Sequence, residues 1–150
     1  MQRIRKLLKS GGRVSIFDNC WSSLTIFPES DYFKQYANDS RKYLVGTGRD
    51  PDIGAKLSYL LHKVGFKDIR VEQVSSFVSL DLNFDDFKWR CERLTEGFYE
   101  DYYTLLGEDK SAFIHNYDIE KLREYKMLLL STPGAQIFEL KFQAEGTISK

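Results

Sequence analysis

The residues best placed to do chemistry lie at and just beyond a short alternating stretch near the start of the chain. The segment "RVSIFD" alternates polar and apolar side chains up to Asp18, and Asn19 and Trp21 follow. This alternation predicts a strand that ends at Asp18. Because ligands of open α/β sheets bind at the carboxyl ends of strands, we expect Asp18, Asn19 and Trp21 to bind substrate. The alternative is structural: Asp18 or Asn19 caps a turn, and Trp21 packs on the core.

One cation and several aromatic side chains are further binding candidates. Arg49 precedes a predicted helix and is expected to pair with an anionic group of a substrate, unless it is simply solvated. Tyr32, Tyr36 and Tyr102 lie in two aromatic-rich helical segments, where rings could line a pocket for a flat or apolar ligand. Ordinary packing of amphipathic helices is the alternative. The same alternatives apply to their aromatic neighbours Phe33, Phe98, Tyr99 and Tyr103.

No pattern in the sequence assigns a catalytic residue or a metal ligand. His62 is expected at the surface, and His115 could be a general base but has no acidic partner at a useful spacing. Cys20 is expected to be a buried thiol rather than a nucleophile. His, Cys and acidic residues form no cluster with metal-ligand spacing.

Composition restricts the partners and the compartment. The chain has 22 Lys and Arg and 22 Asp and Glu, a balance that gives no electrostatic case for nucleic acid or an anionic membrane. Cys20 and Cys91 lie far apart, which suits a reduced, cytoplasmic protein. The basic N-terminus lacks the apolar region of a signal peptide, and the apolar run "MLLL" is too short to span a bilayer.

The first half of the chain predicts a strand–helix–strand unit. A helix over residues 2–9 should stop at Gly11-Gly12, before the strand over 13–18. Residues 19–30 are expected to be irregular, and 29–45 helical. The next helix should begin with Asp50 as its N-cap and Pro51 as its first residue, and end at Gly65. Its apolar stripe consists of Ile53, Leu57, Leu60, Leu61 and Val64.

A strand over residues 67–74 completes this unit, with Ile69, Val71 and Val74 facing inward. The two strands should be parallel and joined by a right-handed crossover. The second half predicts a helix over 84–106 with Asn83 as its cap, a helix over 117–131, and then a strand over 136–146. With 150 residues, the chain fits one α/β domain.

Taken together, these segments resemble the C-terminal part of class I S-adenosylmethionine-dependent methyltransferases. The stretch "RIRKLLKSGGRVSIFD" is similar to the family's helix and fifth strand, with Ser10 where proline is common. The stretch "GRDPDIGAKLSYLLHKVGFKDIRVE" is similar to the next helix and the sixth strand. The segment "QIFELKFQAEGTISK" would be the seventh strand, which runs antiparallel between the fifth and sixth. The resemblance implies a partial Rossmann-like sheet, with helical lid insertions over the substrate at about 28–48 and 84–131.

The resemblance also implies that the main binding motifs for S-adenosylmethionine are missing from this chain. In the family, a glycine-rich turn after the first strand and an acidic residue after the second hold this cofactor. Glycine is needed there because a Cβ would block the approach of the backbone to the ligand. No such unit precedes Leu7, so strands one to four are expected to be absent. The turn "YLVGTGRDPDIG" has a G-x-G outline, but we interpret it as a loop before a capped helix.

Two functions remain open from the sequence. The first is methyl transfer to a small-molecule acceptor, in which the end of the first strand borders the substrate and the isolated chain lacks most of the cofactor site. The second is a non-catalytic remnant that serves as a binding or assembly module. In both cases the edge of the first strand should be exposed, so we expect a dimer or other homo-oligomer, or a partner chain that supplies the missing strands.

Overall fold

The structure is a computed structural model that describes residues 2–97, 99 and 116–148. Contacts within the chain divide it into two compact units. The first unit comprises Met1–Leu24, Asp50–Ser76 and Glu139–Lys150, and the second comprises Thr25–Arg49 and Phe77–Phe138. Both segments predicted as helical insertions, about 28–48 and 84–131, thus fall in the second unit. That the chain folds as one domain stays a prediction.

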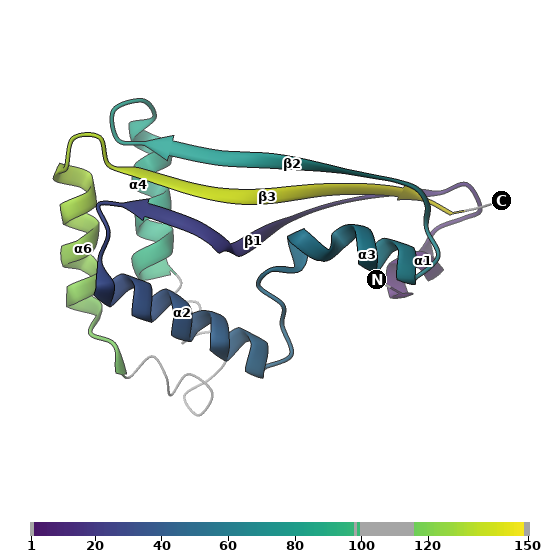
Figure 1. The fold of residues 1–150 in the computed structure, drawn as a ribbon, viewed down its shortest axis with the longest axis horizontal. Helices are drawn as coiled ribbons and strands as arrows, with labels where there is room; N and C mark the ends of the chain where they lie inside the picture. The colour runs from purple at the N-terminus through teal and green to yellow at the C-terminus, as the bar shows by residue number, and fades with distance from the viewer. Residues whose placement is uncertain (1, 98, 100–115, 149–150) are drawn as a thin grey trace. The chain divides into compact units, whose positions relative to one another are not determined.

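A three-stranded sheet runs through the described residues (Figure 1). It consists of β1 (Arg13–Phe27), β2 (Lys67–Ser79) and β3 (Gln136–Thr147), in the order β1-β3-β2. The central strand β3 is antiparallel to both neighbours: Gly11 N donates to Ile148 O at one end, and Leu80 N donates to Ala135 O at the other. The expectation that the last strand lies antiparallel between the other two is therefore confirmed. Strands β1 and β2 run in the same direction, as predicted, but they are not adjacent.

Strand β1 is much longer than the sequence predicts. The expectation of a strand that ends at Asp18, followed by an irregular segment, is wrong, because β1 continues to Phe27. The physical reason is long-range pairing: β3 lies alongside β1, and Leu140 N donates to Ser23 Oγ over 2.8 Å. Local sequence carries little information about such contacts. Strand β2 likewise extends beyond the predicted Val74, to Ser79.

The core of the first unit forms where α3 (Leu57–Lys63) covers one face of the sheet. Leu57 and Leu61 of the predicted stripe are buried and pack with Phe66 and Ala144. A short 3₁₀ helix, η1 (Ile53–Lys56), precedes α3. Gly65 follows α3 with a φ of +86°, so it is the left-handed stop that the sequence predicts. The N-terminal helix α1 (Gln2–Leu7) is likewise followed by Gly11, with a φ of +76°.

The start of this helical segment differs from the prediction. Helical structure begins at Ile53, and Asp50 and Pro51 precede it as a turn. Asp50 Oδ1 accepts a hydrogen bond from Asp52 N at 3.1 Å, and Asp50 O accepts one from Ile53 N at 3.2 Å. The Asp50 side chain thus accepts from the backbone two residues later and stabilises the turn that begins at Asp50, as Asp commonly does. It does not cap a helix that begins at Pro51.

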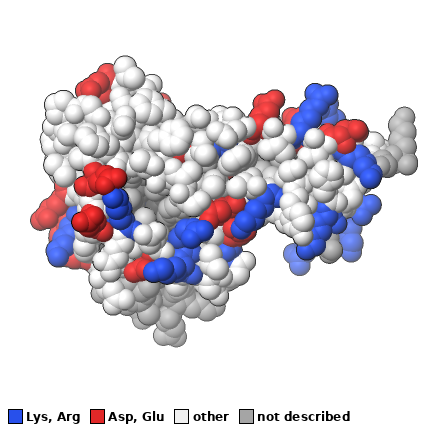
Figure 2. Space-filling view, in the orientation of Figure 1, with Lys and Arg blue, Asp and Glu red and all other residues white. Residues whose placement is uncertain are grey.

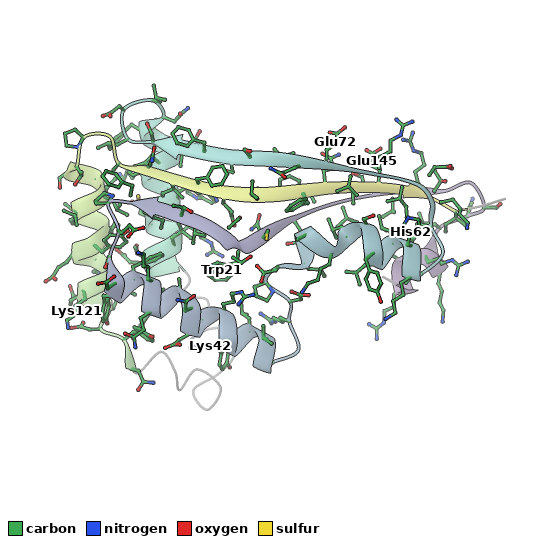
Figure 3. The ribbon with its side chains drawn as sticks, viewed as in Figure 1. Trp21, Lys42, His62, Glu72, Lys121 and Glu145 are labelled. Carbon is green, nitrogen blue, oxygen red and sulfur yellow. The ribbon has the colours of Figure 1, made fainter. Side chains whose placement is uncertain are left out.

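Polar and charged side chains pair on the opposite face of the sheet within the first unit, beside the exposed Phe17. Arg13 pairs with Glu145 at 3.4 Å, and Gln143 Nε2 donates to Ser15 Oγ at 3.3 Å. Glu72 and Glu145 point away from α3 (Figure 3). Of the three β2 residues expected to face inward, Ile69 packs against the core, whereas Val71 and Val74 are not buried, with exposed fractions of 42% and 39%. Strand β2 lies at an edge of the sheet, where side chains are covered less completely.

The second unit contains three helices and a π-helical turn in its described part: α2 (Asp31–Gly46), α4 (Phe84–Glu92), η2 (Arg93–Gly97) and α6 (Ile119–Ser131). Side-chain caps begin two of them: Ser30 accepts from Phe33 N, and Asp118 accepts from Glu120 N. The Asn83 side chain makes no capping bond to α4. The predicted helix over 84–106 is interrupted, because the α-helix ends at Glu92. Its part beyond Gly97, apart from Tyr99, lies outside the described residues.

Gly54 allows η1 to approach β1 closely. A Cβ at this position would lie 2.6 Å from the carbonyl oxygens of both Asp18 and Asn19. Real side chains do not tolerate such distances to backbone atoms, so only glycine fits without moving η1 away from the strand. We therefore expect Gly54→Ala to lower the free energy of unfolding by about 2 kcal/mol, the usual range for overpacking. Urea denaturation followed by circular dichroism measures this difference.

Gly46 provides the matched control for this prediction. It is the last residue of α2, and an added Cβ there has nothing within 4 Å. Gly46→Ala should leave stability unchanged or raise it slightly, because alanine is the better helix former. Equal denaturation midpoints for Gly54→Ala and Gly46→Ala would contradict the close packing of η1 on β1.

Candidate functional site

The middle of β1 is hydrogen-bonded to the turn that precedes η1, and both belong to the first unit. Trp21 N donates to Pro51 O at 3.2 Å, and Ser22 N donates to Asp52 Oδ1 at 2.7 Å. The strand bends here, with Trp21 at the bend (Figure 3). We call Asp18–Ser22 and Asp50–Gly54 together the β1 bend. It contains three of the residues that the sequence singled out for substrate binding.

Asp52 is the residue of the β1 bend that sequence reasoning missed. Its side chain is only 7% exposed, and Oδ1 also accepts a long hydrogen bond from Cys20 Sγ at 3.8 Å. A buried carboxylate is costly unless hydrogen bonds compensate for the lost water, and here a backbone amide and a thiol contribute. Its partners lie about thirty residues away in the sequence. No local pattern therefore pointed to Asp52.

The predicted ligand-binding residues of β1 make local contacts. Asp18 Oδ1 accepts from the adjacent amide, Asn19 N, at 2.8 Å, but both residues lie within β1, so the structural alternative of a turn cap is also wrong. Asp18 is half-buried and Asn19 is exposed. The argument that placed them at the carboxyl end of a strand is wrong, because β1 continues beyond them. Their role in substrate binding stays a prediction without that support.

The aromatic candidates Tyr32 and Tyr36 pack within the second unit. Their ring centroids lie 5.7 Å and 5.1 Å from that of Tyr117, both in edge-on geometry. Tyr32 Oη accepts a hydrogen bond from Asp118 N at 2.6 Å, and Tyr36 is only 2% exposed. These contacts agree with the packing alternative, since they join α2 to the start of α6. Tyr102 lies outside the described residues, as do Phe98, Tyr103 and His115.

A hydrogen-bonded carboxylate lies beside this aromatic cluster. Asp39 accepts from Lys42 Nζ at 2.8 Å and from Tyr117 Oη at 2.6 Å. These hydrogen bonds, that of Lys42 first, hold the pKa of Asp39 below its usual range. Burial, and then the bond to Asp39, raises the pKa of Tyr117. Both groups therefore keep their ordinary protonation states at neutral pH, and Asp39 is a poor general base.

Arg49 is exposed and is the last residue of the first segment of the second unit. Its backbone amide donates to Leu44 O at 3.0 Å, just after Gly48, whose φ is +80°. The G-x-G sequence before it follows a helix instead of a strand, because α2 runs to Gly46. The interpretation of this segment as a loop is therefore confirmed. The six described candidates divide equally: Asp18, Asn19 and Trp21 belong to the first unit, and Tyr32, Tyr36 and Arg49 belong to the second.

Neither cysteine has the character of a nucleophile. Cys20 is buried, as expected, and its thiol donates a hydrogen bond to Asp52. Burial, followed by the charge of Glu92, raises the pKa of Cys91 to about 12. His62 is exposed, as predicted, on α3 (Figure 3). Among residues 2–97, 99 and 116–148, no three His, Cys, Asp or Glu side chains form a group suited to a metal ion.

Comparison with known proteins gives no assignment. No family model matches the chain, and no curated protein is detectably similar to it. Within the part of the chain that the structure describes, no helix has the length and apolar character needed to cross a membrane. A functional proposal therefore rests on the sheet and on the residues described above.

The β1 bend should depend on the oxygen of Asp52. We expect Asp52→Ala to lower the free energy of unfolding by about 1 kcal/mol, because it removes the acceptor of the part-buried hydrogen bond from Ser22 N. Asp52→Asn retains an Oδ1 acceptor and should cost clearly less. Chemical denaturation of both variants measures the difference. Equal losses for alanine and asparagine would show that this hydrogen bond is not what stabilises the bend.

The interaction of Asp39 with Tyr117 should make stability depend on pH. Since the pKa of Asp39 is lower in the folded chain, the interaction stabilises fully above about pH 4, the ordinary value of Asp, and is lost as pH falls through the lowered pKa. Tyr117→Phe should therefore be destabilised relative to wild type at neutral pH, and the gap should narrow in acid. Urea midpoints measured over a series of pH values test this.

Tyr125→Phe is the control for the pH series. Tyr125 Oη donates to a carbonyl oxygen, Pro28 O, at 2.7 Å, and that acceptor does not titrate. The difference in free energy of unfolding between Tyr125→Phe and wild type should stay constant as the pH falls. A constant gap for Tyr117→Phe as well would mean that Asp39 does not contribute through its charge.

Proposed function

We propose that this chain is the substrate-side half of a class I S-adenosylmethionine-dependent methyltransferase domain that methylates a small molecule. The observation that carries the proposal is the order of the sheet. Strand β3, the last in the sequence, lies antiparallel between β1 and β2, which run in the same direction. A simple strand–helix–strand unit would place β1 next to β2. The resemblance seen in the sequence implies this insertion of the last strand.

The helical additions also favour the proposal. The two segments that the resemblance implies as lid insertions are far apart in the sequence, yet they belong to the same compact unit. In that unit Tyr32 and Phe33 of α2 contact Tyr117 and Tyr125, at the start of α6 and within it. A single helical body built from both insertions is what a lid over a substrate requires. Tyr32, Tyr102 and Arg49 are the residues of this unit proposed to contact the acceptor, whereas Tyr36 is buried and packs inside the unit.

The one G-x-G turn of the described residues is not proposed to hold S-adenosylmethionine. The Gly46–Gly48 turn follows a helix, so it lacks the strand–glycine–helix geometry that brings a backbone close to such a ligand. The cofactor would be held by strands that pair with the open edge of β1. What the present residues offer is positioning and exclusion of water, which can suffice for a direct methyl displacement.

The alternative function is a non-catalytic assembly module. It is favoured by the same open edge, because β1 is the outer strand of the described sheet. Part of that strand is already engaged, since Pro51 and Asp52 accept from the amides of Trp21 and Ser22. The stretch before the bend is then the segment that remains for pairing with a second copy or another chain.

Cofactor binding in two states of the protein tests the proposal. The isolated chain titrated with S-adenosylmethionine in a calorimeter should give no saturable heat. The protein purified from its native cells, with whatever completes the sheet, should bind about one radiolabelled cofactor per chain in equilibrium dialysis, as one domain has one such site. Tight binding by the isolated chain would refute the claim that its cofactor site is largely missing. Absence of binding in both states would refute the proposal that the protein is a methyltransferase.

A further inference from the structure

A basic pocket lies between the two short helices of the first unit. It encloses about 230 Å³ and is lined by Arg5 and Lys6 of α1 and by Lys63 and Val64 at the end of α3. Three of its four lining residues are cations, and none is an acid. It is therefore unlike the chain as a whole, in which positive and negative side chains are equal in number.

Among the residues that the structure describes, none is an acidic partner of the basic pocket's cations. Ion pairs within the described residues involve other side chains, and none includes Arg5, Lys6 or Lys63. Lys63 Nζ instead lies 5.7 Å from the centre of the Tyr59 ring. Arg5 approaches the backbone at Gly65, where its guanidinium carbon lies 3.3 Å from the position that a Cβ would take. Glycine at this position thus makes room for the guanidinium.

The surroundings strengthen the positive potential. The first unit contains 11 Lys and Arg and 7 Asp and Glu, whereas the second contains 11 and 15. The neutral chain therefore divides into a unit of net charge +4 and one of net charge −4. Lys and Arg side chains gather over α1 and α3 (Figure 2). An anion that reaches the pocket is attracted by more than its three lining cations.

Helix stabilisation alone accounts poorly for this arrangement. Cations in the last turn of a helix do offset the partial negative charge of its carbonyl groups. However, α1 and α3 have only 6 and 7 residues, so their dipoles are small, and the cations of both converge on one pocket. Like charges that converge repel one another unless an anion lies between them.

We propose that the basic pocket binds a phosphate group, free or carried by a small ligand. The Arg5 guanidinium can donate two parallel hydrogen bonds to phosphate oxygens, and Lys6 and Lys63 add point charges. The volume is below the roughly 300 Å³ of ordinary small-molecule sites, which favours a phosphate-sized group over a whole cofactor. This inference is independent of the proposed methyl transfer, because no residue of the pocket belongs to the candidate acceptor site.

Titration of the isotope-labelled chain with inorganic phosphate, followed by NMR, tests the proposal. Saturable shifts should centre on the amides of residues 5, 6 and 63–65, and sodium chloride at equal ionic strength should not reproduce them. Arg5→Gln and Lys63→Gln should each weaken binding about two- to fivefold, as expected for the loss of one exposed charge contact. Phosphate shifts no larger than those with chloride would overturn the proposal.

Lys88→Gln is the matched control, because it removes one exposed lysine charge from the second unit. Its phosphate affinity should equal that of wild type, and an equal loss in this variant would overturn a localised site. A second titration with adenosine monophosphate distinguishes the two sources of phosphate. Tighter binding than phosphate, with shifts that extend to Tyr59, identifies a ligand that carries its phosphate on an aromatic group. Equal affinity identifies free phosphate.

Discussion

The whole structure depends on the position of β3 between β1 and β2. Each flanking strand has its sheet partner only in the last dozen or so residues of the described chain. Gly12 O and Ile148 N, which are separated by most of the sequence, hydrogen-bond at 3.0 Å. Such contacts carry a large loop-closure cost, which must be met before the pairing stabilises anything. Neither β1 nor β2 has its place in the sheet until β3 is present.

This central strand also explains why the two faces of the sheet differ in the first unit. On one face, Ala144 of β3 lies in the cluster formed by Leu57, Leu61 and Phe66, so α3 is held against the middle of the sheet. On the other face, Glu145 of the same strand pairs with Arg13. Adjacent residues of one strand thus face the core and solvent in turn, as the pleat requires. The ion pair and the polar side chains on this second face are suited to water.

Much of the fold could be predicted, and the errors have a common cause. The helix stripe of Leu57 and Leu61 and the glycine stops Gly11 and Gly65 were predicted correctly because they depend on near neighbours. The length of β1 was not, because its second half is a strand only by pairing with β3. The candidate site was predicted less well than the fold, for the same reason. Asp18 and Asn19 were selected for lying at a strand end that does not exist, and Asp52 was missed.

By itself, the sequence determined most of the local helices and the first part of each strand, since hydrophobic periodicity, capping residues and glycines act over a few residues. The order of the strands was expected only from the family resemblance. The sequence also determined that the total charge is zero. Only the tertiary structure decided that this charge divides into two units of opposite sign and that Arg5 and Lys63 share a pocket. Only the tertiary structure decided that Ser22 hydrogen-bonds to Asp52. These contacts join residues far apart in the chain, and the free energy that fixes them arises only when the strands and helices pack together.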